Sequence, residues 1–576
     1  MLVSNFVAFS LALIAVAPLV FAVDVPVRIE PVYARNGIVV AGHPQAAEVG
    51  RMVLQAGGNA IDAAVSTSLA LGVAEPYASG LGGKLMLLYY EAATHRIFVV
   101  DAMDEAGGLD VQAYLRRPVE DRTFGFGSVC VPGLTAGLWA AHRRWGRRIW
   151  ADDVQPAISL ARAGARVLPK TRSLIEEQKD KLRHGNADIA RCFLFDGKPP
   201  EIGTLLANPD LAQTLERIAR DGRDGFYRGE VGARLAQALR QGGGVIDAAD
   251  LASYQARIAE PIEIDFRGYR LAGAPPPASG AALLFTLLKL LENDDFGGGP
   301  LRRATNLDNL GSYWRLAEPK VRKLVGDRPE SRAGVEGLLS PASIDAIRHD
   351  AVMNSPALKG LSVGPANLRH GTRGTGFRVE DAAAASTTHF VIVDAWGDIV
   401  CATQSLSFHF GAGVIAPGTG VVLNDSMSNF VFDDPGNPNF VAPHVRPQSD
   451  MAPVLVLRDG RPVLALGAPG GGRIVTAVLQ VLLDHLVLDR PLAEAIGDTR
   501  FSFVATGGTE NGGFEAEKSL PDAEVVAMRR FGWKLELPES AGTGRRFGGV
   551  NAVEINSDGT LTGFADPRRT NAADGY

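Results

Sequence analysis

Three pairs of short apolar segments, each joined by a tight turn, dominate the sequence after residue 386. HFVIVD and IVCATQSL flank the turn AWGD, whereas APVLVLRDGRPVLALGAP and NAVEINSDGTLTGFAD turn at Asp459-Gly460 and Asp558-Gly559. Apolar, β-branched runs on both sides of an Asp-Gly turn are typical of β-hairpins. Between the second and third pairs, RIVTAVLQVLLDHL has the spacing of a helix. The last third of the chain is therefore predicted to be rich in hairpins.

Before residue 380 the apolar residues recur at helical spacing instead. Residues 45–74 predict helices interrupted at Gly57-Gly58, and residues 281–293 predict another after the turn-forming PPPASG. Residues 208–240 read as amphipathic helices. Residues 360–386 show no periodicity and are interpreted as a mobile linker inside the fold. A helix-rich part joined to a hairpin-rich part predicts helices packed on sheets.

Length, charge and cysteine content exclude several classes of protein. With 576 residues, the chain predicts more than one domain or one large layered domain. A net charge of -6 gives no electrostatic case for nucleic acid. Cys130, Cys192 and Cys401 lie far apart, which argues against a disulfide framework, and the ten histidines form no ligand spacing. We therefore expect neither a metal nor another cofactor.

The first 22 residues, MLVSNFVAFSLALIAVAPLVFA, have the features of an export signal. Val20 and Ala22 suit cleavage after Ala22, although no Lys or Arg precedes Arg28. An uncleaved anchor is the alternative. Export predicts a periplasmic or secreted protein with no further membrane partner, since no other stretch is long and apolar enough to span a bilayer.

The stretch AAAASTTHFVIVD at 382–394 joins small residues to two threonines and a strand. A plain junction between a loop and a strand is one interpretation. The other is a cleavage site, because a threonine hydroxyl becomes a useful nucleophile when the α-amino group of the same residue acts as its base. A free α-amino group titrates near pH 8 and is partly neutral at physiological pH. Cleavage before Thr387 would create such a group.

The glycine-rich segment GAPGGGR at 467–473 also has two interpretations. It lacks the Gly-Lys-Ser/Thr of a phosphate-binding loop, so it reads as a turn from a strand to a helix. In the functional interpretation, the backbone N–H groups of Gly470 and Gly471 lie at a helix N-terminus and stabilise an oxyanion.

These motifs together resemble those of the γ-glutamyltransferase (glutathione hydrolase) family. The similarity extends over nearly the whole chain after the export segment, and it is specific because the order and spacing of the motifs match together. The motifs are GGNAIDAA (57–64), SGLGG (79–83), RGY and PPPASG (267–280), TTHF (387–390), RPQSDMAP (446–453), GAPGGGRI (467–474) and ADPRRTNAADGY at the C-terminus.

The resemblance implies the αββα sandwich of N-terminal-nucleophile hydrolases, made from one self-cleaving chain. The cut would fall between Ser386 and Thr387, leaving a large subunit (23–386) and a small catalytic subunit (387–576) as a heterodimer. Thr387 would be the nucleophile, Ser405 its hydrogen-bonding partner, and Gly470 and Gly471 the oxyanion hole. Thr388 and His389 match the motif and are given a structural role.

The residues expected to hold the substrate depart from the family pattern. The family's arginine falls at Met103, its strand asparagine at Ser407, its amine-binding pair at Ser426 and Asn429, and its serine pair at Ser449 and Asp450. Asp450 is expected to repel a carboxylate. Each lost charge-assisted hydrogen bond removes about 1.5–3 kcal/mol. Lys84 also intrudes on a glycine-rich run, and residues 430–446 are shorter than the lid of long-lid members, which predicts a more open site.

We therefore expect an amide hydrolase or acyltransferase acting on a small amide or peptide that is not a standard γ-glutamyl compound. One alternative is a true glutathione hydrolase with unusual contacts, in which Arg116 or Arg117 binds the carboxylate. A second is an inactive envelope binding protein on the same scaffold, against which the presence of both Thr387 and Ser405 argues.

Overall fold

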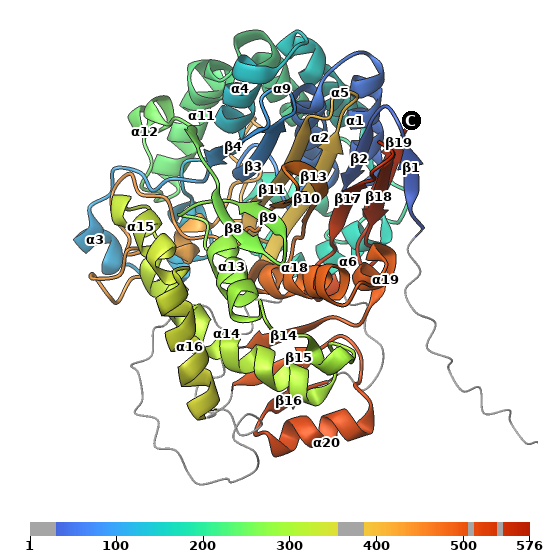
Figure 1. Cartoon of the computed structure of the whole chain (residues 1–576). Helices are drawn as coiled ribbons and strands as arrows, with labels where there is room; N and C mark the ends of the chain where they lie inside the picture. The colour runs from blue at the N-terminus through green and yellow to red at the C-terminus, as the bar shows by residue number, and fades with distance from the viewer. Residues whose placement is uncertain (1–29, 355–384, 505–511, 538–544) are drawn as a thin grey trace, which may run out of the picture.

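Two seven-stranded antiparallel sheets form the centre of the computed structural model, which describes residues 30–354, 385–504, 512–537 and 545–576 (Figure 1). In spatial order, the first sheet contains β1 (Val32–Ala34), β18 (Leu561–Ala565), β17 (Asn551–Ile555), β13 (Arg461–Gly467), β12 (Val454–Arg458), β9 (Tyr269–Gly273) and β8 (Ile262–Phe266). The second contains β19 (Ala572–Gly575), β2 (Ile38–Ala41), β10 (Ala385–Val393), β11 (Ile399–Phe408), β3 (Lys84–Glu91), β4 (Arg96–Ala102) and β7 (Arg257–Ala259).

The two sheets pack face to face because alternate residues of each strand point to opposite sides. Val391 and Cys401 belong to the apolar core between the sheets, together with Leu455 of the first sheet. Their neighbours Phe390 and Ala402 belong to a second core, which the helices cover. The second sheet is therefore buried on both faces.

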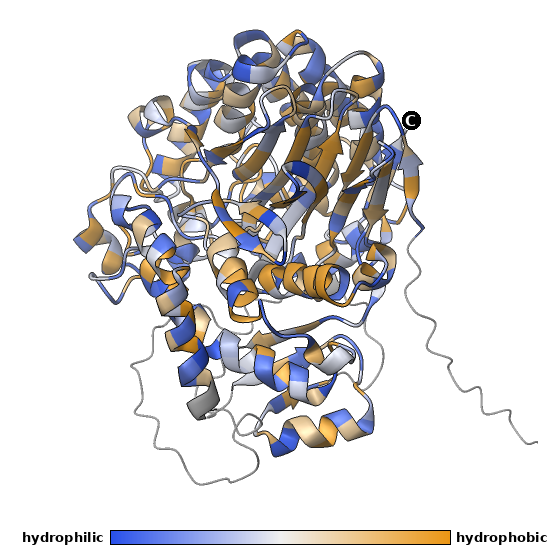
Figure 2. Cartoon of the chain, in the orientation of Figure 1, coloured by the Kyte–Doolittle hydropathy of each residue, from blue (hydrophilic) through white to orange (hydrophobic). Residues whose placement is uncertain are grey.

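Helices cover the outer face of each sheet. The second sheet packs against α1 (Pro44–Gln55), α2 (Ala60–Ala74) and α4 (Leu134–Trp145). The apolar core on this side continues into α5 (Trp150–Ala163), α9 (Pro209–Asp221) and α11 (Gly229–Gln241). The first sheet packs against α13 (Gly280–Leu290) and α18 (Ile474–Leu482), and α14 (Ala304–Leu324) packs in turn against α13. Figure 2 shows α13 and α18 to be largely hydrophobic, as expected for helices buried against a sheet. The four layers confirm the predicted αββα sandwich.

Shorter elements complete the described chain. A three-stranded sheet of β14 (Phe501–Val504), β15 (Gly513–Ala516) and β16 (Lys534–Glu536) lies beside α20 (Asp522–Arg530) at the bottom of Figure 1. The others are α3 (Val111–Leu115), α6 (Pro169–Glu177), α7 (Lys179–His184), α8 (Ala187–Phe193), α10 (Asp224–Tyr227), α12 (Ala248–Ser253), α15 (Pro329–Leu338), α16 (Pro341–Asn354), α19 (Leu492–Gly497), β5 (Ala165–Arg166) and β6 (Leu205–Leu206).

All three predicted hairpins are present, as β10–β11, β12–β13 and β17–β18. The predicted helices are present as α1 and α2, α9 to α11, α13 and α18. Gly57, with a φ of 84°, ends the first of them, and the Asn59 side chain caps the second.

The expectation of a helix-rich N-terminal part was incomplete, because that part also supplies strands to both sheets. Strand β3 is almost entirely buried, so its sequence KLMLLYYE lacks the alternation that marks a half-exposed strand. The expected export segment lies outside the described residues, and so does the expected linker except Ala385 and Ser386, which begin β10. No described helix is both long and apolar enough to cross a membrane.

Candidate active site

Thr387 lies near the start of β10 and points into the space between the two sheets. It shares this side of the strand with His389, which contacts Gly467 of β13, and with Val391 of the core between the sheets. Solvent has little access to this position, since Thr387 is 5% exposed and Ser386 is fully buried. The threonine hydroxyl is therefore held at the edge of a rigid core.

A β-bulge brings Ser405 of β11 next to Thr387. Ser386 pairs with Ser407, but Thr388 pairs with Gln404, so two residues of β11 oppose Thr387 alone. Ser407 adopts a φ of 82°, a left-handed conformation that is uncommon for a residue with a side chain. The sequence gives no sign of this irregularity, because the bulge contains no glycine.

The bulge creates a chain of hydrogen bonds around the Ser386 carbonyl. The Thr387 hydroxyl donates to Ser405 Oγ at 3.1 Å and also lies within hydrogen-bonding reach of that carbonyl. The Ser405 hydroxyl donates to the same carbonyl and accepts from the Ser407 N–H at 2.9 Å. Thr387, Ser405 and the Ser386–Thr387 peptide bond thus form one connected unit in the uncut chain.

Gly470 and Gly471 lie in the turn before α18. The 3-10 turn Gly471–Arg473 packs against β10. Gly470 has a φ of 147° and Gly471 a φ of 56°, conformations that favour glycine. Within the described chain, neither N–H donates to another backbone group. A buried ion pair between Arg473 and Glu515 holds the end of the turn.

Five polar residues, which we term the polar wall, are linked by polar contacts near Ser405, which pairs with Lys84 of β3. Lys84 Nζ donates to Ser407 Oγ at 2.6 Å and to Ser426 Oγ at 2.9 Å, and lies 3.7 Å from Asp104. Ser426 donates to Asp104, and Asn429 Nδ2 donates to Ser407 Oγ at 3.1 Å. Three of the predicted substrate-binding residues therefore lie together, bonded to a lysine and an aspartate.

Asp104 has no bulk solvent contact. Burial raises the pKa of its carboxyl group to about 7, against the opposing effects of Lys84 and Ser426. The sequence shows that Lys84 interrupts a glycine-rich run. It does not predict that Asp104 is the partner of Lys84, because Asp104 follows a different strand.

Met103 does not reach the polar wall, because its side chain is buried in the core between the sheets. The backbone of Met103 accepts a hydrogen bond from the Tyr254 hydroxyl at 2.6 Å. Arg117, considered above as a replacement cation, donates instead to the Gly243 carbonyl and lies over the Tyr114 ring. Arg116 is exposed.

Asp450 has a cationic partner that the sequence did not reveal. Arg322 of α14 lies 2.7 Å from Asp450, and Ser279 donates to the same carboxylate at 3.1 Å. Ser279 also donates to the Ser449 carbonyl, which fixes this pair of residues against the PPPASG turn. Asp450 therefore does not present the uncompensated negative charge that we expected. No local pattern connects an arginine in a helix with a loop this distant in sequence.

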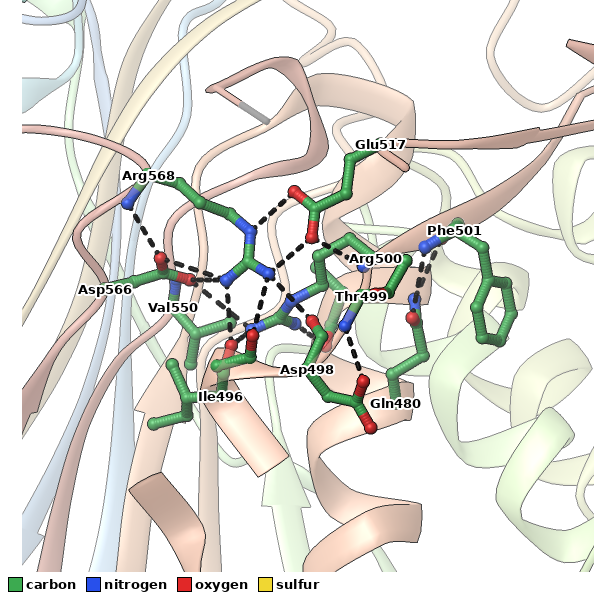
Figure 3. A network of polar contacts seen from close by, with 12 residues as sticks. Gln480, Ile496, Asp498, Thr499, Arg500, Phe501, Glu517, Val550, Asp566 and Arg568 are labelled. Carbon is green, nitrogen blue, oxygen red and sulfur yellow. Dashed lines mark hydrogen bonds and ion pairs between the residues drawn. The ribbon is translucent and has the colours of Figure 1, made fainter. Parts of the chain in front are cut away.

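The C-terminal motif reaches the nucleophile through Arg569, which donates to the Thr387 carbonyl at 3.3 Å. The preceding residues hold it in place through the buried network in Figure 3. Arg568 Nε donates to Glu517 at 2.7 Å, and both Arg568 and Arg500 lie within 3.4 Å of Asp566. The motif ADPRR thus links the small three-stranded sheet to β10.

Thr388 and His389 have surroundings that suit structural roles. Thr388 faces the helix layer near the buried Glu75. Burial raises the pKa of Glu75, but Lys170 above all, with His43 and the Thr388 hydroxyl, outweighs this effect and lowers it. His389 shares a hydrogen bond with Thr403 Oγ1 at 2.8 Å, and burial lowers its pKa to about 3. The imidazole is therefore neutral at physiological pH, bonded to β11 and packed against Gly467 of β13.

Asp62, His142 and Asp153 form a separate buried cluster, with ligand atoms within 4.8 Å of one another. The backbone N–H of Arg147 already donates to Asp62 at 3.0 Å, and Arg148 binds Asp153 at 2.8 Å. These bonds engage Asp62 and one oxygen of Asp153 from within the helix layer, and the other Asp153 oxygen lies 3.3 Å from His142 Nε2.

A strand threonine held between two stacked sheets, with helices outside both, defines an N-terminal-nucleophile hydrolase fold. A cephalosporin acylase from Bacillus halodurans has this architecture, with a TM-score of 0.83 and 25% identity over 96% of this chain and 98% of that one. The sequence model of gamma-glutamyltranspeptidase matches residues 46–576. The chain therefore belongs to the gamma-glutamyltranspeptidase family and is an enzyme of that type.

Two curated relatives show how the family divides. A glutathione hydrolase proenzyme from Bacillus subtilis (strain 168) is 32% identical over 94% of this chain and 92% of its own length. An acylase ACY 1 proenzyme from Pseudomonas sp. (strain SE83) is 34% identical over 93% of each chain. Overall identity thus does not separate the two activities, and the site must be compared residue by residue.

Proposed function

We propose that the chain cuts itself between Ser386 and Thr387 and then acts as an amide hydrolase and acyltransferase on substrates other than standard γ-glutamyl compounds. The hydrogen-bonded unit of Thr387, Ser405 and the Ser386 carbonyl is the observation that carries this proposal. The word proenzyme in the names of both relatives supports a processed chain.

In the self-cleavage step, Thr387 Oγ1 attacks the carbonyl carbon of Ser386. Ser405 donates to the carbonyl oxygen and so stabilises the negative charge that develops there. The C–N bond breaks, the Thr387 nitrogen takes up a proton, and Ser386 is left as an ester on Oγ1. Water hydrolyses this ester, releasing the Ser386 carboxylate and a free α-amino group on Thr387.

In the catalytic cycle, the new α-amino group accepts the proton of Oγ1 as the oxygen attacks the substrate amide. The N–H groups of Gly470 and Gly471 stabilise the oxyanion. The amine product leaves with a proton, and the acyl group stays on Thr387 as an ester. Water or a second amine then attacks that ester, so the same intermediate serves hydrolysis and transfer.

The contacts of the polar wall support a substrate outside the γ-glutamyl class. Ser407, Ser426 and Asn429 are engaged with resident groups rather than open to a ligand. The alternative of a true glutathione hydrolase is favoured by Arg322, which places a partly exposed cation beside Asp450.

Denaturing electrophoresis tests the self-cleavage. Wild-type protein is expected to give two bands, the smaller one beginning at Thr387, and Thr387→Ala to give one band. N-terminal sequencing of the small band checks the position. A single wild-type band under maturing conditions, or two bands from Thr387→Ala, would contradict the proposal.

A further inference from the structure

We infer that Asp62, His142 and Asp153 bind one divalent transition-metal ion, of which zinc is the simplest case. The ion links three helices of the layer that covers the second sheet, and it stabilises that layer. The three residues lie outside the hydrogen-bonded unit that contains Thr387, so the inference does not depend on the proposed function.

The three ligands come from the ends of three helices. Asp62 lies in the first turn of α2, His142 in the last turn of α4, and Asp153 in the first turn of α5. Helix α2 packs against both of the others. Because the three residues belong to separate elements, they form no local ligand spacing, and the sequence alone gave no reason to expect a metal.

The separations of the ligand atoms match those of a zinc site. His142 Nε2 lies 3.6 Å from Asp62 Oδ1 and 3.3 Å from Asp153 Oδ2, and all three atoms lie within 4.8 Å of one another. Atoms bound tetrahedrally at about 2.0–2.2 Å from zinc are about 3.3–3.6 Å apart. A small rotation of one carboxylate therefore suffices to bring all three atoms onto one ion.

Two of these atoms are buried and face the cluster without a hydrogen-bond partner. Neither His142 Nε2 nor Asp153 Oδ2 makes a hydrogen bond within the part of the chain that the structure describes. The His142 side chain is 8% exposed and the Asp153 side chain 0%. A buried polar atom without a partner destabilises a fold, and a bound cation satisfies both atoms at once.

The other contacts of the two carboxylates hold them in place. The Asn59 N–H donates to Asp62 Oδ2 at 2.9 Å, and the Arg147 N–H donates to Asp62 Oδ1 at 3.0 Å. Arg148 Nε donates to Asp153 Oδ1 at 2.8 Å, which leaves Oδ2 for the ion. Hydrogen bonds of this kind orient ligating carboxylates, whose oxygens keep further lone pairs. Two carboxylates also outweigh one guanidinium, so the cluster attracts a cation.

One imidazole and two carboxylates form a ligand set for a transition metal. Zinc accepts histidine nitrogen and aspartate oxygen, whereas calcium and magnesium prefer oxygen ligands alone. Three protein ligands leave the fourth tetrahedral position of zinc to a water molecule. The Arg148 side chain beside the cluster is 23% exposed, which places the site near the surface and within reach of ions from solvent.

The metal content of untagged wild-type protein tests the site. Protein stripped with EDTA, equilibrated with zinc and dialysed is expected to retain about one zinc ion per chain, measured by mass spectrometry of the metal. Calcium and magnesium at the same concentration are expected to bind at least about tenfold more weakly. Anomalous diffraction at the zinc edge is expected to place the ion between Asp62, His142 and Asp153.

Two variants that each remove one ligand check the assignment. His142→Gln and Asp153→Asn are expected to weaken zinc binding at least about tenfold and to abolish the rise in melting temperature that zinc gives the wild type. His444→Gln is the matched control, because His444 also lies beside two carboxylates, 3.8 Å from Glu105 and from Asp250, but is about half exposed. It is expected to keep both the zinc and the rise.

Several results would overturn the inference and leave His142 and Asp153 as an ion pair. These are a wild type that retains little zinc, calcium binding as tight as zinc binding, zinc that both ligand variants keep, and zinc that His444→Gln loses. Melting without zinc shows whether each variant has folded. If one has not, the anomalous peak in the wild type decides, and its absence from the cluster would overturn the site.

Discussion

Ser405 lies between Thr387, the proposed nucleophile, and the Ser386 carbonyl that Thr387 attacks. The Ser405 hydroxyl therefore acts both as hydrogen-bond acceptor and as hydrogen-bond donor. It accepts a hydrogen bond from Thr387 and donates one to the Ser386 carbonyl. Removing a positioned proton donor from a reaction of this type slows it by about 10²–10⁴-fold. Ser405→Ala is therefore expected to slow self-cleavage at least about 100-fold, while Ser405→Thr keeps a hydroxyl and cuts at a rate near that of the wild type.

The decay of the full-length band after synthesis measures both rates. Circular dichroism and melting of the uncut protein show whether each variant has folded. Cleavage of Ser405→Ala at the wild-type rate would rule out the hydroxyl as a participant and leave it as a packing residue.

His389 makes the free energy of unfolding depend on pH in the acid range. Its pKa is lowered to about 3 in the folded state because the buried site disfavours the imidazolium. Below pH 6.5 the unfolded chain takes up a proton that the folded chain does not, so stability falls as the pH falls. At pH 5 this residue alone lowers the free energy of unfolding by about 2 kcal/mol, and the loss is absent above pH 6.5.

Urea unfolding of the uncut Thr387→Ala chain at pH 7.5 and pH 5 measures this loss. Adding His389→Gln is expected to reduce the difference between the two pH values by about 2 kcal/mol. The exposed His184→Gln controls for removal of an imidazole. An equal loss with and without His389 would show that another group causes the acid sensitivity.

At the scale of the element, the turn before α18 depends on a glycine conformation. Gly470 has a φ of 147°, and an added Cβ would lie 3.3 Å from Gly548 Cα. Gly470→Ala is therefore expected to move the backbone N–H groups of the turn and to lower kcat about 100-fold, as removal of an oxyanion donor does. Gly460→Ala is the matched control, because that hairpin glycine has a φ of 77° with open space around it.

Both variants put a side chain on a left-handed residue, so both are expected to lose about 1 kcal/mol of stability. Only Gly470→Ala is expected to lose activity as well. Equal kcat values for the two variants, measured on processed protein, would argue against an oxyanion hole in this turn.

The elements also show what the sequence could predict. The hairpins at Asp459 and Asp558 could be predicted because an Asp-Gly turn is a local sequence signal. The helices could be predicted because one face of each is apolar. Strand β3 was missed because burial on both faces removes the alternating pattern. The family resemblance predicted Thr387, Ser405, Gly470 and Gly471 as members of one site. The partners of the polar wall and of Asp450 could not be predicted, since Asp104 and Arg322 reach the site from other elements.

At the scale of the whole molecule, the network around Arg568 joins three segments. Glu517 follows β15, Asp566 follows β18, and Arg568 binds both. Removing one partner leaves buried charges uncompensated, which costs about 3–5 kcal/mol. Arg568→Met is therefore expected to lower the free energy of unfolding by this amount and to slow self-cleavage by releasing Arg569. Arg546→Met, at a half-exposed arginine, is expected to cost less than about 1 kcal/mol.

Urea unfolding of the uncut chain compares the two arginine variants. A loss below about 1 kcal/mol in Arg568→Met would mean that the network in Figure 3 is not a structural link.

Strands that precede the proposed cut and strands that follow it share both seven-stranded sheets. In the second sheet, β2 lies between β19 and β10, and β3 pairs with β11. In the first sheet, β1 and β9 flank four strands from the last third of the chain. Separating the two products would therefore break pairings in both seven-stranded sheets and expose the core between them, since neither of these sheets belongs to one fragment alone.

We expect the two fragments to stay together after cleavage and to separate only when the fold is lost. Size-exclusion chromatography of processed protein should give one peak containing both bands, and the bands should part only in denaturant. The unfolding transition should report both fragments at the same urea concentration, whether followed by Trp fluorescence or by release of the small fragment from a tagged large one. Elution of the fragments in separate peaks under native conditions would mean that the shared sheets do not hold the processed enzyme together.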